Sequence, residues 1–119
     1  MKEKTAAKKT NTRESFVRKR GNALKQETQN ELERFRDYLR EQEKSNHTIE
    51  KYCRDVRKFL MFAGEEWDKN TIISFKEYLQ AHYKTSSANS MLASLNSYFH
   101  FIGRQEYCVR TFRVQKRIF

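Results

Sequence analysis

The stretch Asn46–Ala63, NHTIEKYCRDVRKFLMFA, decides the fold that we predict for this chain. Wound as an α-helix at about 100° per residue, it has two faces of different chemistry. The apolar face, which we expect to pack inward, contains Ile49, Tyr52, Val56, Phe59, Leu60 and Ala63. The opposite face carries four basic or weakly basic side chains, His47, Lys51, Arg54 and Lys58. The acids Glu50 and Asp55 are predicted at its flanks. Such a cationic stripe either binds a polyanion or only keeps a surface helix soluble.

Three further helices are predicted around this one. The first runs from about Thr28 to Glu43, the third begins at a cap formed by Asp68, Asn70 or Thr71 and ends at His82, and the fourth starts after Thr85, Ser86 and Ser87 and ends at Ile102. Ser45 or Asn46 can cap the second helix, whereas Gly64 and Gly103 are expected to end the second and fourth. The inward side chains of these three helices are predicted to be Leu32, Phe35, Tyr38, Leu39, Ile72, Phe75, Leu79, Met91, Leu92, Leu95, Tyr98, Phe99 and Ile102, with Trp67 as a plug over the intervening loop. The fold class is therefore all-α, a small four-helix bundle with basic flexible termini.

Composition excludes several classes of protein. The chain has 119 residues, no proline and three glycines, and no apolar run approaches the roughly 20 residues that a membrane span needs. We therefore expect a soluble cytoplasmic protein without membrane partners. Cys53 and Cys108 lie far apart without CxxC spacing, and the three histidines have no partners at ligand spacing, so neither a disulfide, a metal nor a cofactor is predicted.

The formal charge of +10 is concentrated at the two ends. Residues 1–27 carry a net +6, residues 28–103 a net 0 and residues 104–119 a net +4. We interpret 1–27 as a disordered basic arm that seeks polyanions, with a solubilising leader as the alternative. Residues 28–103 are predicted to form the helical domain, and 104–119 a basic linker containing Arg110, Arg113, Lys116 and Arg117.

The fourth predicted helix has an unusual outer face. No acidic residue occurs between Glu77 and Glu106, and the side opposite the apolar stripe carries Ser86, Asn89, Ser90, Ala93, Asn96, Ser97 and His100. Such short polar side chains favour close approach to phosphates and base edges, although a protein surface could also pack there. The second and fourth helices both begin at a lysine followed by Ser, Thr or Asn, at Lys44–Thr48 and Lys84–Ser87. Helix N-termini of this kind bind phosphate groups.

Four sequence motifs resemble the N-terminal core-binding, SAM-like domain of phage-type integrases and other tyrosine recombinases. Ser45-x-x-Thr48-x-x-x-Tyr52-x-x-Asp55-Val56-x-x-Phe59-x-x-Phe62 is similar to that domain's second helix, and Phe35-x-x-Tyr38-Leu39 to the end of its first. Thr71-Ile72 resembles the start of the third helix, and the run from Ser87 to Ile102 resembles the fourth. The likeness extends over about residues 28–119, because Val114–Phe119 resembles the linker that precedes the catalytic domain.

This resemblance implies a domain that forms half of a clamp on duplex DNA, with the second and fourth helices facing the major groove beside the crossover site. It assigns phosphate contacts to Lys44, Asn46, His47, Lys51 and Arg54, with base contact from Asn46 or His47. The complete DNA-binding set that we predict is Lys44, Ser45, Asn46, His47, Thr48, Lys51, Arg54, Lys58, Lys84, Thr85, Ser86, Ser87, Asn89, Ser90, Arg113, Lys116 and Arg117. Further partners would be other recombinase protomers assembled on DNA, with a monomer in isolation.

We predict no catalysis from this chain. Tyrosine recombinases cleave DNA with a tyrosine assisted by arginines, a lysine and a histidine, all of which belong to the following domain in that family. Here His100 and Arg104 are one residue too far apart to match its His-x-x-Arg motif, and Tyr107 has no accompanying cluster. We therefore expect a fragment or truncated product that functions in DNA integration and recombination by binding DNA. The alternative is a helical protein–protein interaction module.

Overall fold

The structure, a computed structural model, describes residues 24–113 and is all-α over that range. Its helices are α3 (Gln26–Glu41), α4 (Asn46–Ala63), α5 (Lys69–His82) and α6 (Thr85–Phe101), followed by the one-turn 3-10 helix η1 (Gln105–Tyr107). The predicted four-helix fold is confirmed. The predicted basic arm up to residue 23 and the linker residues Lys116 and Arg117 lie outside the described residues.

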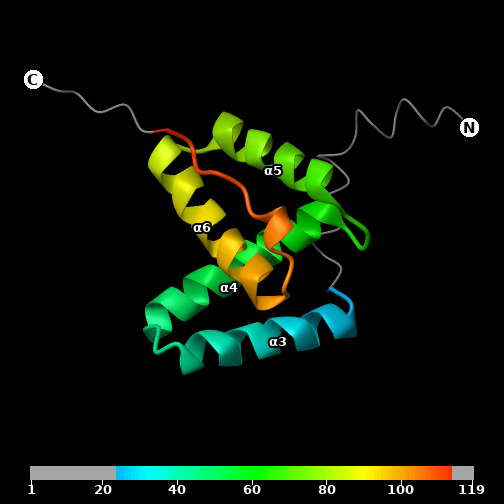
Figure 1. The fold of residues 1–119 in the computed structure, drawn as a ribbon, viewed down its shortest axis with the longest axis vertical. Coiled ribbons are helices and arrows are strands. Elements are labelled where there is room, and N and C mark those ends of the chain that lie inside the picture. Colours follow the sequence, from blue (N-terminus) through cyan, green and yellow to red (C-terminus); the bar gives the residue numbers. More distant parts are fainter. Residues whose placement is uncertain (1–23, 114–119) are drawn as a thin grey trace, which may run out of the picture.

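Helix α4 is the centre of the domain, since α3, α5 and α6 all pack against it (Figure 1). The ring of Phe59 lies 5.1 Å from that of Trp67, 5.3 Å from Phe75 and 6.0 Å from Phe99, each in an edge-to-face arrangement. These contacts join α4 to α5, to α6 and to the loop between α4 and α5. The apolar face of 46–63 therefore decides the fold because three partners share it.

The core has the composition that the helical spacing predicts. Its buried members include Leu32, Phe35, Leu39, Ile49, Val56, Phe59, Leu60, Ile72, Phe75, Leu79, Met91, Leu92, Leu95, Tyr98 and Phe99. The other predicted inward residues, Tyr38, Tyr52, Ala63 and Ile102, are half-buried and pack at its margin. Trp67 closes the core over the α4–α5 loop, as predicted, by packing on Phe59 and Phe99.

The start of each helix follows from the residue before it. Ser45 caps α4 by accepting a hydrogen bond from the Thr48 N–H at 3.1 Å, and Asp68 caps α5 through a reciprocal capping box with Thr71. Helix α6 starts at Thr85, three residues earlier than predicted. Its N-cap residue is Lys84, which makes no side-chain capping bond, so the hydroxyl residues that we expected before the helix form its first turn.

Helices α3 and α6 end in the same way. Glu43 has a φ of +62° and Gly103 a φ of +76°, both in the left-handed region. After α6, the Arg104 N–H reaches the Phe99 carbonyl at 2.9 Å, and Lys44 bonds back to α3 in the corresponding way. This Schellman ending stops α3 at Glu41, two residues before the predicted end, although the left-handed position there is not a glycine.

The segment after α6 does not leave the domain at once. Residues 104–113, which the sequence predicts to be part of a linker, run back beside α6 and along α5 toward the start of α6 (Figure 1). We refer to residues 108–113 as the C-terminal strap. Among the described residues, no helix has both the length and the apolar character needed to cross a membrane.

Candidate nucleic-acid interface

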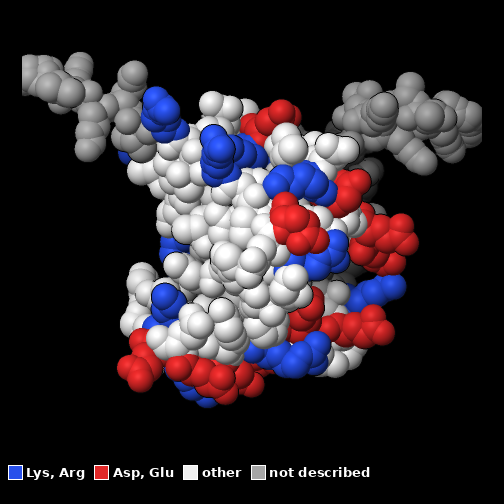
Figure 2. All heavy atoms as spheres, viewed as in Figure 1, with Lys and Arg blue, Asp and Glu red and all other residues white. Residues whose placement is uncertain are grey.

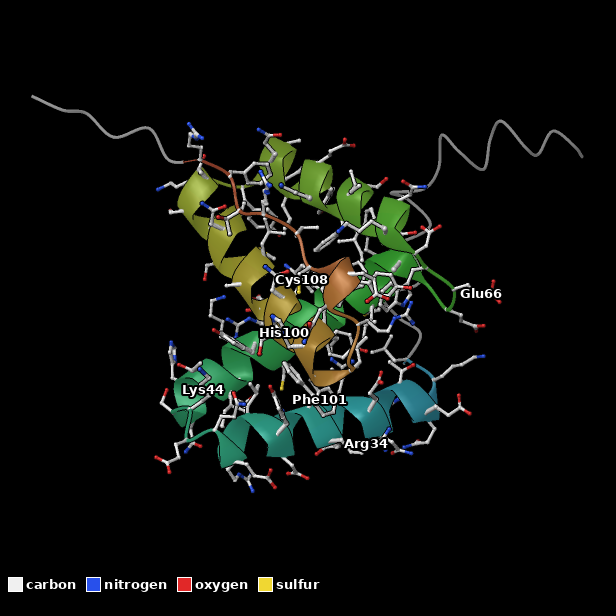
Figure 3. The ribbon with its side chains drawn as sticks, viewed as in Figure 1. Arg34, Lys44, Glu66, His100, Phe101 and Cys108 are labelled. Carbon is white, nitrogen blue, oxygen red and sulfur yellow. The ribbon has the colours of Figure 1, made fainter. Side chains whose placement is uncertain are left out.

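The two phosphate-binding turns predicted from the sequence lie at one edge of the domain. Helices α4 and α6 both begin at the left edge in Figure 1, although they run in different directions from there. Lys44 is at this edge in Figure 3, whereas Glu66 of the α4–α5 loop is at the opposite edge. The fold therefore places on one side of the domain two helix N-termini that are about 40 residues apart in sequence, with the start of α6 above that of α4 in this view.

In the turn before α4, one side chain caps the helix and several others are exposed. Besides capping the helix, the Ser45 hydroxyl donates to the Thr48 hydroxyl at 3.0 Å, so these two predicted contact residues are hydrogen-bonded to each other. Lys44, Asn46 and His47 are exposed. These three side chains can therefore meet a ligand without disrupting the cap.

The turn before α6 is more open. Lys84, Thr85, Ser86 and Ser87 are all exposed, and none of their side chains caps the helix. The first backbone N–H groups of α6 have no intrahelical partners, and they carry the partial positive charge of the helix dipole. This arrangement suits an anion.

The cationic face of α4 differs from its prediction at Lys51 and Asp55. Asp55 is not at the flank of an exposed face: it is 5% exposed and lies between α4 and α6. Its Oδ2 accepts bonds from the Lys51 ammonium at 2.5 Å and from the buried Ser94 hydroxyl at 2.8 Å. The Lys51 ammonium also lies 3.4 Å from the Ser90 carbonyl. A buried carboxylate needs such partners, so Lys51 joins α4 to α6 rather than projecting freely.

Lys58 is also committed to another part of the domain. Its ammonium donates to the Tyr83 hydroxyl at 3.1 Å, across the interface to the α5–α6 connection. Of the four residues on the predicted cationic face, His47 and Arg54 are therefore the exposed ones.

Asn89, predicted to contact DNA, faces the C-terminal strap. Its amide donates to the Phe112 carbonyl at 2.9 Å, and its Oδ1 accepts from the Phe112 N–H at 2.6 Å. Asn96 pairs with Val109 in the same way, with both bonds at 2.9 Å. The prediction that Asn89 lies on an open face is wrong. Its side-chain amide is hydrogen-bonded to both the N–H and the carbonyl of Phe112, so the strap covers it.

The rest of the α6 face is uncharged. Ala93 and His100 are exposed and Ser97 is half-buried. In Figure 2, few acidic side chains show over α6 and the strap, while acidic side chains gather along α3 at the lower edge and at the right edge. This part of the surface therefore presents little negative charge to an approaching phosphate.

Three arginines line a groove between α3 and α4, and the predicted DNA-binding set contains only one of them, Arg54. The groove has a volume of about 390 Å³, and Arg36, Arg54 and Arg57 border it. Arg36 is paired with Glu50 at 2.6 Å, which lowers the pKa of that carboxyl, whereas Arg57 is exposed like Arg54. The helical spacing of Arg54 and Arg57 was the available signal, since residues three apart are neighbours on a helix.

A comparison with protein families matches residues 32–106 to the phage integrase, N-terminal SAM-like domain. The chain belongs to this family. A search of curated proteins found no match, and neither did a search of solved structures. The matched range contains both turns predicted to bind phosphate and most or all of every described helix of this SAM-like domain. The C-terminal strap lies beyond it.

The opposite edge of the SAM-like domain has the wrong charge for a polyanion. A groove of about 660 Å³ there is lined by Trp67 and Tyr98 together with Glu27, Glu31, Glu65 and Glu66. Lys25 also lines it but is paired with Glu65 at 2.9 Å. This acidic groove distinguishes the two edges and leaves the edge with the helix N-termini as the candidate interface.

The residues nearest to the His-x-x-Arg motif of recombinases, His100 and Arg104, and the nearby Tyr107 contact one another's neighbours within the domain. The Arg104 guanidinium bonds Glu106 at 2.6 Å and the Tyr107 hydroxyl at 2.8 Å, and it lies over the Tyr107 ring. His100 lies beside Cys108, with Nε2 and Sγ 3.8 Å apart, and burial raises the pKa of that thiol. In residues 24–113, no cluster of His, Cys, Asp and Glu has the arrangement of a metal site.

Proposed function

We propose that this SAM-like domain is a DNA-binding module of a tyrosine recombinase or integrase. It would form half of a clamp on duplex DNA at the crossover site and contribute binding, not strand cleavage, to site-specific recombination and DNA integration. The observation that carries the proposal is the presence of two basic helix N-termini at one edge of the domain, opposite the acidic groove. The phosphates of a duplex would be attracted by the basic groups of the first edge and repelled by the acidic groups of the second.

The exposed residues of this edge would contact DNA, and the two lysines that are bonded within the domain would support it. Lys44, Asn46, His47 and Arg54 would bind from α4 and the turn before it, and Lys84 with Thr85, Ser86 and Ser87 from the start of α6. Lys51 and Lys58 would support the surface from within, since their ammonium groups hold neighbouring elements together. Arg113 at the end of the strap would add a further phosphate contact.

The domain boundaries follow from the same proposal. The residues before α3 would act as a polyanion-seeking arm, α3 to α6 as the helical domain, and 104–119 as the basic segment after it, including Lys116 and Arg117. On DNA, the domain would meet other recombinase protomers, while in isolation it would be a monomer. Its place would be the cytoplasm, on the DNA of a bacterial cell or phage.

A duplex-binding titration at two salt concentrations tests this function. Contact with about five phosphates predicts a slope of log K against log salt near −4 to −5. Arg54→Gln should reduce the size of that slope by about 0.9, because one phosphate contact is lost. Arg34→Gln is the matched control, since Arg34 is exposed on α3 and should leave the slope unchanged. A flat salt response, or equal effects of both changes, would contradict the proposal and favour a protein–protein module.

A further inference from the structure

We propose that Asn89 and Asn96 are positioning residues that make the C-terminal strap part of the DNA-binding surface. This inference rests on the proposed function, which assigns duplex DNA to the edge where the strap ends. Through the two asparagines, the fold would hold Arg110 and Arg113 in fixed places on the domain. The basic segment would then bind as a built surface, not as a free tail.

The spacing of the two asparagines matches that of the strap residues they hold. Asn89 and Asn96 are seven residues apart on one face of α6, which corresponds to about 10.5 Å along the helix axis. Phe112 and Val109 are three residues apart in a segment outside helix and strand, which can span about 10 Å. Because the two distances agree, both amide pairs form without distortion of either element. The order is antiparallel, with Asn89 at the later strap residue and Asn96 at the earlier one.

Helix α5 holds the strap from its other side. The Lys69 ammonium donates to the Glu106 carbonyl at 3.0 Å and to the Cys108 carbonyl at 2.8 Å. Lys76, seven residues further along α5, places its ammonium 4.9 Å from the centre of the Phe112 ring. The strap thus has anchors on two helices, and the residues they hold are those that turn inward.

The strap residues that face outward are the ones that suit a polyanion. Val109 and Phe112 are half-buried, whereas Arg110, Thr111 and Arg113 are exposed. The strap runs toward the start of α6 (Figure 1), where Lys84 and the uncapped N–H groups lie. Holding two arginines beside that site removes the entropy cost of ordering them when DNA binds.

The clamp can be tested in the full chain by hydrogen–deuterium exchange without any DNA. In Asn96→Ala, the amide of Val109 loses its acceptor and should exchange faster, and the Phe112 amide should follow as the strap loosens. Asn70→Ala is the matched control, because Asn70 is exposed near the start of α5 and should leave both exchange rates unchanged. Unchanged exchange at Val109 in Asn96→Ala would overturn the clamp itself.

Duplex titration then tests what the clamp does. Arg110→Gln combined with Arg113→Gln should reduce the size of the salt slope by about 1.8, as expected for two phosphates. Asn96→Ala should weaken binding by about tenfold at low salt and should make the two arginine changes less costly, since an unpinned strap holds the arginines poorly. Purely additive effects, together with faster exchange at Val109, would show that the strap is pinned but does not position the arginines.

The clamp on the strap and the role of the strap in DNA binding can be contradicted by different results. If wild type shows no salt-dependent duplex binding, the proposed DNA function and the positioning role both fall, whereas protected amides at Val109 and Phe112 would still show the clamp. If wild type binds with the expected slope and the arginine changes leave it unaltered, the positioning role falls and the proposed function stands.

Discussion

Ser94 on α6 donates its hydroxyl to the carboxylate of Asp55 on α4 over 2.8 Å, and both side chains are buried. Lys51 completes the cluster from the surface side, because its side chain is 27% exposed while its ammonium reaches Asp55. This polar contact lies within the α4–α6 interface, between the two helices whose N-termini form the candidate DNA-binding edge. It therefore fixes how those helices are placed relative to each other.

Removing the buried carboxylate should destabilise the domain strongly. Asp55→Ala leaves the Lys51 ammonium and the Ser94 hydroxyl without their main acceptor, so we expect a loss of about 2–3 kcal/mol in the free energy of unfolding. Urea unfolding followed by the fluorescence of Trp67, the single tryptophan, measures this. Glu50→Ala is the control, because its ion pair with Arg36 is solvent-exposed and its loss should hardly move the midpoint.

Stability should fall in alkaline solution because of Tyr98. Burial, together with a hydrogen bond to Glu31 at 2.6 Å, raises the pKa of this phenol far above its ordinary value of 10.0. Above about pH 10, the Tyr98 phenol of the unfolded state releases its proton while that of the folded state keeps it. The folded state then binds more protons, so the free energy of unfolding decreases as the pH rises. Urea unfolding between pH 8 and 11 should show this decrease, and Tyr98→Phe should make it shallower. An equally steep decrease in the variant would assign the effect to other groups.

Both left-handed helix endings should be more stable with glycine than with another residue. Glu43→Gly places glycine where φ is already +62° and should stabilise the domain by about 0.5–1 kcal/mol. Gly103→Ala should destabilise it by at least as much, although a Cβ there meets no atom within 4 Å, because only the backbone is strained. Thermal unfolding of both variants tests this. Changes of the same sign would show that side-chain contacts, not φ, control the two endings.

Adding a capping side chain to α6 should raise the stability of the domain but weaken its binding to duplex DNA. Lys84→Asp supplies the missing acceptor at the N-cap and should raise the free energy of unfolding by about 0.5–1 kcal/mol. The same carboxylate would occupy the N–H groups that the proposed function assigns to phosphate, so duplex binding should weaken more than in Lys84→Ala, which only removes the charge. Urea unfolding and duplex titration give the two readouts. Equal binding by the two variants would mean that the N-terminus of α6 does not contact DNA.

The features that could be predicted from the sequence are those that depend on residues close together within one helix. The apolar stripe of α4 is a local feature and appears in the structure as predicted, and the caps Ser45 and Asp68 are each one of the alternatives that the sequence allows. The start of α6 was misplaced because Lys84 is not a capping residue, so the later hydroxyl residues gave a stronger but misleading signal.

What could not be predicted depends on partners far along the chain. Asp55 looks like a surface acid until Ser94, 39 residues later, is known to lie against it. A polar residue on a helix face, such as Asn89, has the same pattern whether it meets water, DNA or a returning segment of the chain. Only the fold shows that its partner is Phe112.

The matched spacing of the two asparagines has an evolutionary consequence. Inserting or deleting one residue between Val109 and Phe112 would shift one amide pair by more than 3 Å, so that both pairs could no longer form together. Homologues that keep both asparagines should therefore keep the number of residues between these two strap positions, whereas the identity of Thr111 can vary. Changes in length are expected outside the segment that the two amide pairs span.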